Sequence, residues 1–190
     1  MIPDTCVDII YRMDEEKRIV VSDFNGINDS SFYVHNEENN VHKMSVFAIR
    51  FYAWGDSVFA EDSFAGTVNG RSDVRERFSW LGRELRKRLV EPVDLADITH
   101  LTERLLINRL QTARNHELID TAIDNIILHH GALDVSRLSR ECFIGSRQLE
   151  RQFHEYIGIT PKKLSNLVRE FKRYHLMNIQ TARKTAFSDL

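Results

Sequence analysis

The stretch CFIGSRQLERQF, residues 142–153, combines apolar and hydrogen-bonding side chains at the spacing of a helix. Leu149 and Phe153 supply an apolar face, whereas long polar side chains lie on the outer face: Arg147, Gln148, Glu150, Arg151 and His154. Arginine can bind guanine O6 and N7 with two donors at once, and glutamine can pair with adenine. Such a face is able to read base edges in a DNA major groove. The charge pattern alone supports a solvated protein surface equally well, so both interpretations stay open at this point.

A helix-turn-helix would hold these side chains in place. Asp134 is a capping residue for a short helix over 135–142, and a tight turn follows. The helix with the polar face then opens at Gly145 and Ser146 and ends before Gly158. Two short helices joined by a tight turn, with apolar residues of the second facing inward, are typical of a helix-turn-helix.

Two further helices frame this motif. The segment from His116 to Gly131 predicts a helix that a left-handed glycine closes. Thr160 and Pro161 begin a long helix to about Met177, because threonine favours the capping position and proline the first helical position. Residues 116–190 therefore predict an all-α domain. Four residues of its first helix are expected to face inward: Leu118, Ala122, Ile126 and Ile127.

Residues 131–173 resemble the first helix-turn-helix of the AraC family of transcription regulators. The shared features are the glycine that ends the first helix, L-S where the family has L-A, the L-x-R-x-F of LERQF, the G-x-T-P of GITP, and Arg169 in the following helix. The resemblance implies a transcription regulator that binds double-stranded DNA. We expect Lys162, Lys163 and Arg169 to meet phosphates and the residues of the second helix to read bases. The expected DNA-binding residues are Ser146, Arg147, Gln148, Glu150, Arg151, His154, Lys162, Lys163 and Arg169.

Two positions depart from the family's pattern. The family usually places glycine where Phe143 stands and serine where Gly145 stands. Phe143 would strain a turn that requires positive φ, and Gly145 caps a helix without a side-chain oxygen. We expect a local adjustment of the turn within an intact helix-turn-helix.

Members of this family carry two helix-turn-helix units joined by a long helix. Residues 160–177 resemble that linker helix, and NIQTARKTAFSDL resembles the approach to the second unit, with SDL at the start of its first helix. We therefore expect the chain to be a fragment that stops before the second recognition helix. Its start, IPDTCVDIIY, resembles a strand that follows further residues in relatives of this architecture.

The first half of the chain predicts an α+β domain. Four β-rich runs within residues 5–54 are expected to form a small antiparallel sheet: TCVDIIY, RIVVSDF, SFYVH and HKMSVFAIRFYAW. From Ser72 the apolar spacing becomes helical, which predicts helices from Ser72 to Leu89 and from Asp94 to Arg114 that cover the sheet. The expected fold is thus an α+β domain over 1–115 followed by an all-α helix-turn-helix domain over 116–190, with few contacts between them.

The runs IPDTCVDIIY and VFAIRFYAWG resemble an uncharacterised regulatory domain type found ahead of AraC-like DNA-binding units. Such a domain implies a sensor of a small-molecule effector, a dimerisation module, or both. The leucine-bearing helices near 73–90 and 94–114 offer more apolar surface than a small sheet can bury, so we expect a homodimer. Aromatic residues of strands are more often plain core, but six of them could line an effector pocket: Phe32, Tyr33, Phe47, Phe51, Tyr52 and Trp54.

The charge distribution favours a polyanionic partner for the second half. Residues 1–115 contain 15 Lys and Arg against 19 Asp and Glu, whereas residues 136–184 contain 11 against 4. No apolar run approaches the roughly 18 residues of a membrane span, and signal-peptide features are missing, so we expect a cytoplasmic protein without a membrane partner. Cys6 and Cys142 lie in apolar patterns and are expected to be buried, reduced thiols.

The sequence shows none of the common catalytic motifs that we considered. The sequence contains no HExxH motif, phosphate-binding glycine loop or G-x-S-x-G elbow. His129 and His130 are adjacent, and neighbouring residues of a helix do not face the same point. We expect no enzyme activity, cofactor or metal. Two classes stay open beside the DNA-binding regulator: a protein-interaction module for an acidic partner, and a small-molecule-binding protein with a helical scaffold.

Overall fold

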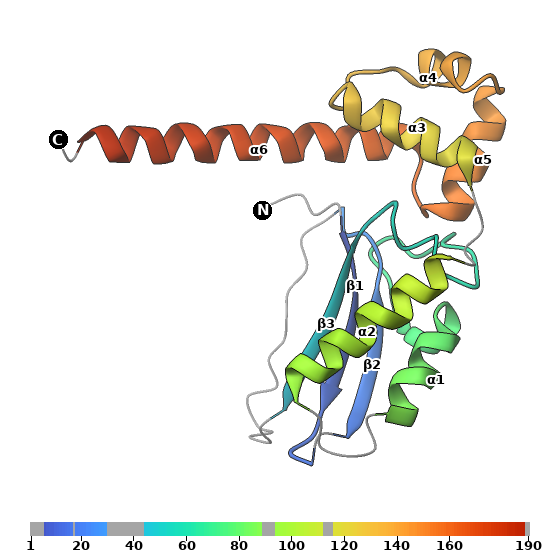
Figure 1. The fold of residues 1–190 in the computed structure, drawn as a ribbon. Coiled ribbons are helices and arrows are strands. Elements are labelled where there is room, and N and C mark those ends of the chain that lie inside the picture. The colour runs from blue at the N-terminus through green and yellow to red at the C-terminus, as the bar shows by residue number, and fades with distance from the viewer. Residues whose placement is uncertain (1–5, 17, 30–43, 89–93, 112–115, 189–190) are drawn as a thin grey trace.

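The computed structural model describes residues 6–16, 18–29, 44–88, 94–111 and 116–188, with side chains described up to Tyr174 except that of Leu95. The chain mixes a four-stranded antiparallel sheet with helices, as the sequence predicts. Figure 1 shows the sheet with α1 and α2 in one part of the molecule and α3 to α6 in another. We call residues 6–111 the N-terminal part and residues 116–188 the C-terminal part.

The sheet has the strand order β3-β1-β2-β4. Its long strands are β1 (Cys6–Met13), β2 (Ile19–Asn25) and β3 (Ser45–Tyr52), which confirm three of the predicted runs. The fourth described strand is β4 (Arg71–Asp73), which pairs with β2 and lies where a helix was predicted to begin. The predicted strand SFYVH, residues 31–35, lies outside the described residues.

The two faces of the sheet differ in chemistry. Val7, Ile9, Tyr11 and Met13 of β1 alternate toward the buried face, which α1 and α2 cover in Figure 1. The opposite face carries ion pairs, such as Arg50 Nε to Asp8 Oδ1 at 2.7 Å. This one-sided burial is typical of an antiparallel sheet that packs against helices.

The predicted first helix begins later than its apolar spacing indicated. After β4 the chain forms a 3₁₀ turn, η1 (Val74–Glu76), and only then α1 (Ser79–Arg88), because Asp73 ends the strand and caps the turn through the Arg75 amide. Helix α2 (Leu95–Leu110) follows. Six apolar residues at helical spacing in these segments are nevertheless buried, whereas Leu105 and Leu106 are half-buried: Val74, Phe78, Leu81, Leu85, Ile98 and Leu101.

The C-terminal part contains α3 (Glu117–Leu128), α4 (Val135–Glu141), α5 (Ser146–Tyr156) and α6 (Pro161–Ser188). The expected end of the last helix near Met177 is wrong, since α6 continues to Ser188 through a stretch without glycine or proline. In α3, Ala122 and Ile126 are buried as expected, whereas Leu118 is half-buried and Ile127 is 37% exposed. The buried residues of this helix are Ile119, Ala122, Ile123 and Ile126.

Several specific contacts join the two parts. The Phe64 amide donates to the Glu155 carbonyl at the end of α5 (2.8 Å), and Lys163 of α6 pairs with Asp29. A Cβ on Gly158 would lie 2.7 Å from the Phe64 carbonyl oxygen, so only glycine permits this approach. The buried apolar residues of both parts form one continuous cluster.

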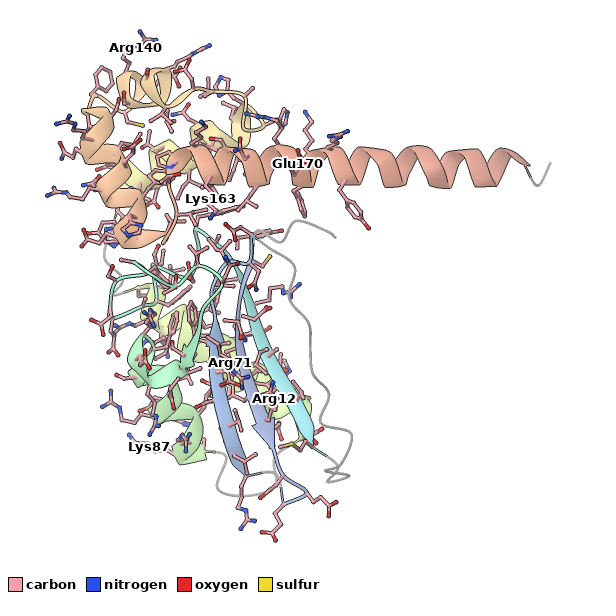
Figure 2. The ribbon with its side chains drawn as sticks, turned by 180° about the vertical axis from the view of Figure 1, so that it is seen from behind. Arg12, Arg71, Lys87, Arg140, Lys163 and Glu170 are labelled. Atoms are coloured by element: carbon pink, nitrogen blue, oxygen red, sulfur yellow. The ribbon has the colours of Figure 1, made fainter. Side chains whose placement is uncertain are left out.

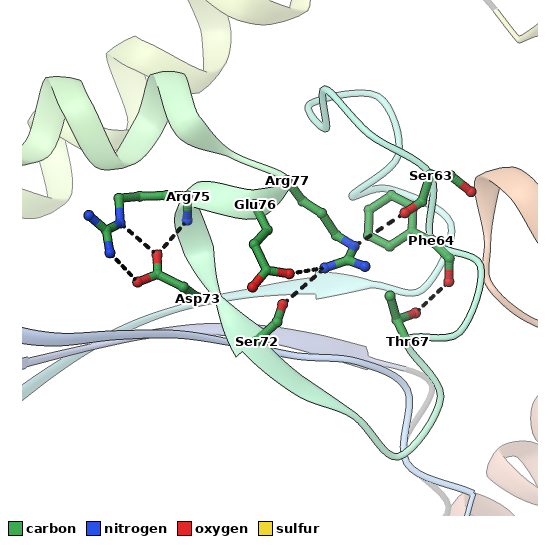
Figure 3. Close-up of polar contacts among 8 residues, drawn as sticks. All are labelled: Ser63, Phe64, Thr67, Ser72, Asp73, Arg75, Glu76 and Arg77. Carbon is green, nitrogen blue, oxygen red and sulfur yellow. Dashed lines mark hydrogen bonds and ion pairs between the residues drawn. The ribbon is translucent and has the colours of Figure 1, made fainter.

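Arg77 fixes the loop that makes these contacts. Its Nε donates to the Ser63 carbonyl (3.2 Å) and its Nη1 to Ser72 Oγ (2.9 Å), as Figure 3 shows. The Thr67 hydroxyl donates to the Phe64 carbonyl at 2.7 Å and closes the same loop. The position of α5 relative to the sheet therefore depends on a hydrogen-bonded loop as well as on apolar packing.

Candidate nucleic-acid interface

The α4–turn–α5 segment consists of two short helices joined by a tight turn. The Asp134 carboxylate caps α4 by accepting from the Arg137 amide at 2.7 Å, as its residue type predicts. After α4, the Ile144 amide donates to the Ser139 carbonyl (3.0 Å) and closes the turn. Phe143 takes the left-handed conformation, with φ of 54°, instead of the local adjustment that was expected, and its side chain is 93% exposed. The turn therefore closes although a bulky residue occupies it.

Packing and capping position α5. Leu149 and Phe153 are fully buried, which sets the outer face of the helix. Gly145 is the N-cap and has no side-chain acceptor, as expected. Ser146 Oγ lies 3.0 Å from Ser139 Oγ, so this hydroxyl links α5 to α4 instead of pointing outward.

The outer face of α5 carries polar side chains that have no partner among the described residues. All five polar residues predicted there are exposed, and within the described part of the chain none of their side chains forms a hydrogen bond or ion pair. The first turns of α5 lie beside α4, whereas its last turn contacts the N-terminal part through Glu155. Four of these polar side chains therefore belong to the part of α5 that is remote from this contact: Arg147, Gln148, Glu150 and Arg151.

The three predicted phosphate contacts differ in their surroundings. Lys162 is exposed, and its amino group has no partner among the described residues. Lys163 pairs with Asp29, and this hydrogen bond, with another from Asn69, lowers the pKa of the Asp29 carboxyl. Arg169 donates from Nη2 to the Gly131 carbonyl at 2.5 Å. Lys163 and Arg169 thus hold parts of the protein together in this arrangement.

Sequence reasoning did not single out Arg140. This residue lies in the last turn of α4, is exposed, and pairs with no other described residue through its side chain. In Figure 2 it lies at the end of the C-terminal part that is far from the sheet. The first helix of a helix-turn-helix crosses the DNA backbone, so a basic residue at this position was a usable signal.

The predicted pocket aromatics separate into two groups. Phe47 is buried in the core, and Phe51 packs against Phe59 and Phe78 with ring centroids 5.4 and 6.5 Å away. Tyr52 and Trp54 instead line a groove beside α6. Phe32 and Tyr33 lie outside the described residues.

Comparisons of the chain with protein-family models, curated proteins and solved structures find no match. The resemblance to the AraC family therefore stays a prediction from the sequence pattern of residues 131–173. In the described part of the chain, no three His, Cys, Asp or Glu side chains gather where they could hold a metal ion. None of the helices described there has both the length and the apolar character of a membrane span. Cys6 and Cys142 form no disulfide; Cys142 is buried as expected, whereas Cys6 is only half-buried.

Proposed function

We propose that the chain is a sequence-specific DNA-binding transcription regulator of the AraC type. In this proposal residues 116–190 form the DNA-binding domain, and residues 1–115 form a cytoplasmic sensor and dimerisation domain. One observation carries it: the outer face of α5 presents long hydrogen-bonding side chains that are exposed and have no partner among the described residues.

We assign base recognition to the N-terminal half of α5. Arg147 and Arg151 lie four residues apart and therefore share one helical face, with Gln148 and Glu150 beside them. The N-terminal residues of a recognition helix are the ones that contact base edges. Two arginines suit guanine, Gln148 suits adenine, and Glu150 can accept from the cytosine amino group. His154 lies one turn farther on and is assigned to the edge of the interface.

Phosphate contacts are assigned to Lys162 and Arg140. Both side chains are exposed basic groups that flank α5 in the chain. They supply charge without base recognition, so they orient the protein on any duplex. Lys163 and Arg169 are withdrawn from this group, because their side chains bind Asp29 and the Gly131 carbonyl.

Selection of random duplexes with the full-length protein tests this function. We expect one sequence pattern to become enriched over successive rounds. The Arg147→Ala protein should select a pattern in which one or two base pairs are no longer specified. The Arg104→Ala protein, changed at an exposed position of α2, should select the unaltered pattern. The absence of any enriched pattern with the unaltered protein would contradict sequence-specific binding.

A further inference from the structure

A groove of about 360 Å³ lies where the end of β3 meets the side of α6. One wall contains Tyr52 and Trp54, whose rings are stacked with centroids 4.9 Å apart and an interplanar angle of 7°. The other wall consists of Ile127, Val168 and Phe171, from α3 and α6. Figures 1 and 2 show from opposite sides that α6 passes over this end of the sheet. The groove therefore has walls from both parts of the chain.

The apolar walls are open to water. Tyr52 is 57% exposed, Ile127 37% and Phe171 36%. Contact of apolar surface with water is unfavourable, and concave apolar sites of a few hundred Å³ at the boundary of two units are a usual place for small ligands. A planar ring placed against the Tyr52–Trp54 pair would cover this surface and stack on it. The shape and the lining thus favour a small aromatic occupant.

The charged groups at the groove are basic. Lys172 and His130 belong to the lining, which contains no acidic residue in the described part of the chain. Neither of these two side chains has a hydrogen bond or ion pair within that part. Glu170 is two residues from Lys172 on α6, and side chains at that spacing do not face each other. An anionic group in the groove would therefore meet an ammonium group that no carboxylate of the described residues pairs with.

We propose that this groove binds a small aromatic carboxylate, with its ring against Tyr52 and Trp54 and its carboxylate paired with Lys172. Such a ligand contacts β3 and α6 at once, and it stabilises the arrangement of the two parts in which the groove is formed. The role of this ligand as an effector of DNA binding rests on the proposed function. Its binding to the groove does not.

Calorimetric titration of the full chain without DNA tests the proposal, with 1-naphthoate and its neutral amide as probes. We expect the acid to bind about fivefold more tightly than the amide, because only the acid forms an ion pair with Lys172. Lys172→Gln should remove this preference. Trp54→Ala should weaken both probes by about tenfold through loss of the stacked surface. Lys87→Gln, a matched change on α1 in the N-terminal part, should leave both affinities unaltered.

Several results would overturn the proposal. One is a failure of the acid to saturate the protein at about 1 mM, the weak end of small-ligand affinity. Another is equal affinity for the acid and the amide in the unaltered chain. A third is a preference for the acid that persists in Lys172→Gln, a change at an exposed position that does not disturb the core. Self-association that Trp54→Ala abolishes would assign the groove to a second copy of the chain. The titrations contain no DNA, so their outcome does not depend on DNA binding. A chain that binds the probes as expected but does not bind DNA would contradict the proposed function alone.

Discussion

Gly131 lies where the loop after α3 meets the backbone of α6. Its φ is +72°, and a Cβ at this position would lie 2.0 Å from the Ser165 carbonyl oxygen. A left-handed conformation costs an L-residue about 1–2 kcal/mol, and relief of such an overlap costs about 1–3 kcal/mol. Because the overlapping atom is helix backbone, rotation of a side chain cannot remove it. Gly131→Ala should therefore lower the free energy of unfolding by about 2–5 kcal/mol.

Urea unfolding followed by circular dichroism measures this change. Gly145→Ser is the matched control, since a Cβ there meets nothing within 4 Å and the new hydroxyl can cap α5. We expect the control to raise stability by a few tenths of a kcal/mol, about the difference between serine and glycine at an N-cap. A loss below about 1 kcal/mol for Gly131→Ala would refute the close approach of this loop to α6.

Two further predictions concern the turn and the contact between the two parts. Phe143→Gly should stabilise the chain by about 0.5–1 kcal/mol, because glycine adopts positive φ freely and the lost ring is exposed; destabilisation in thermal unfolding would contradict this. The contact with Lys163 lowers the pKa of the Asp29 carboxyl below its ordinary value of 3.8. This contact therefore stabilises the fold fully above pH 3.8, and the stabilisation is lost as the pH falls through the lowered pKa. Asp29→Asn should therefore be less stable than the unaltered chain at pH 7 and equally stable in acid, and a difference that is the same at both pH values would argue against the ion pair.

Local chemistry allowed much of the C-terminal part to be predicted. Asp134 caps α4 and Thr160 caps α6, because these side chains bond to nearby backbone amides whatever surrounds them. Gly131 is left-handed as expected, although His130 also takes positive φ, so that the helix end extends over two residues. Capping and turn signals depend on a few neighbouring residues and can be found in a single sequence.

Longer-range features escaped prediction for a physical reason. Strand β4 is three residues long and exists because Asp23, Phe24 and Asn25 of β2 offer it a hydrogen-bonding edge. The contacts of Lys163 with Asp29 and of Arg169 with Gly131 join residues far apart in the chain. No local pattern marks such pairs, so these two basic residues were expected to face DNA. The exposed face of α5 was predictable, since it follows from Leu149 and Phe153 alone.

Equilibrium binding of the full-length protein to its selected duplex tests the assignment of base recognition to α5 most directly. Arg147→Ala and Arg151→Ala should each cost about 1–3 kcal/mol on that duplex and much less on an unrelated one. Lys162→Ala should weaken both duplexes alike and reduce the salt slope by about one. Arg104→Ala should change neither affinity. If Arg147→Ala and Arg151→Ala leave affinity and sequence preference unaltered, the arginines of α5 are solvated surface and do not read DNA.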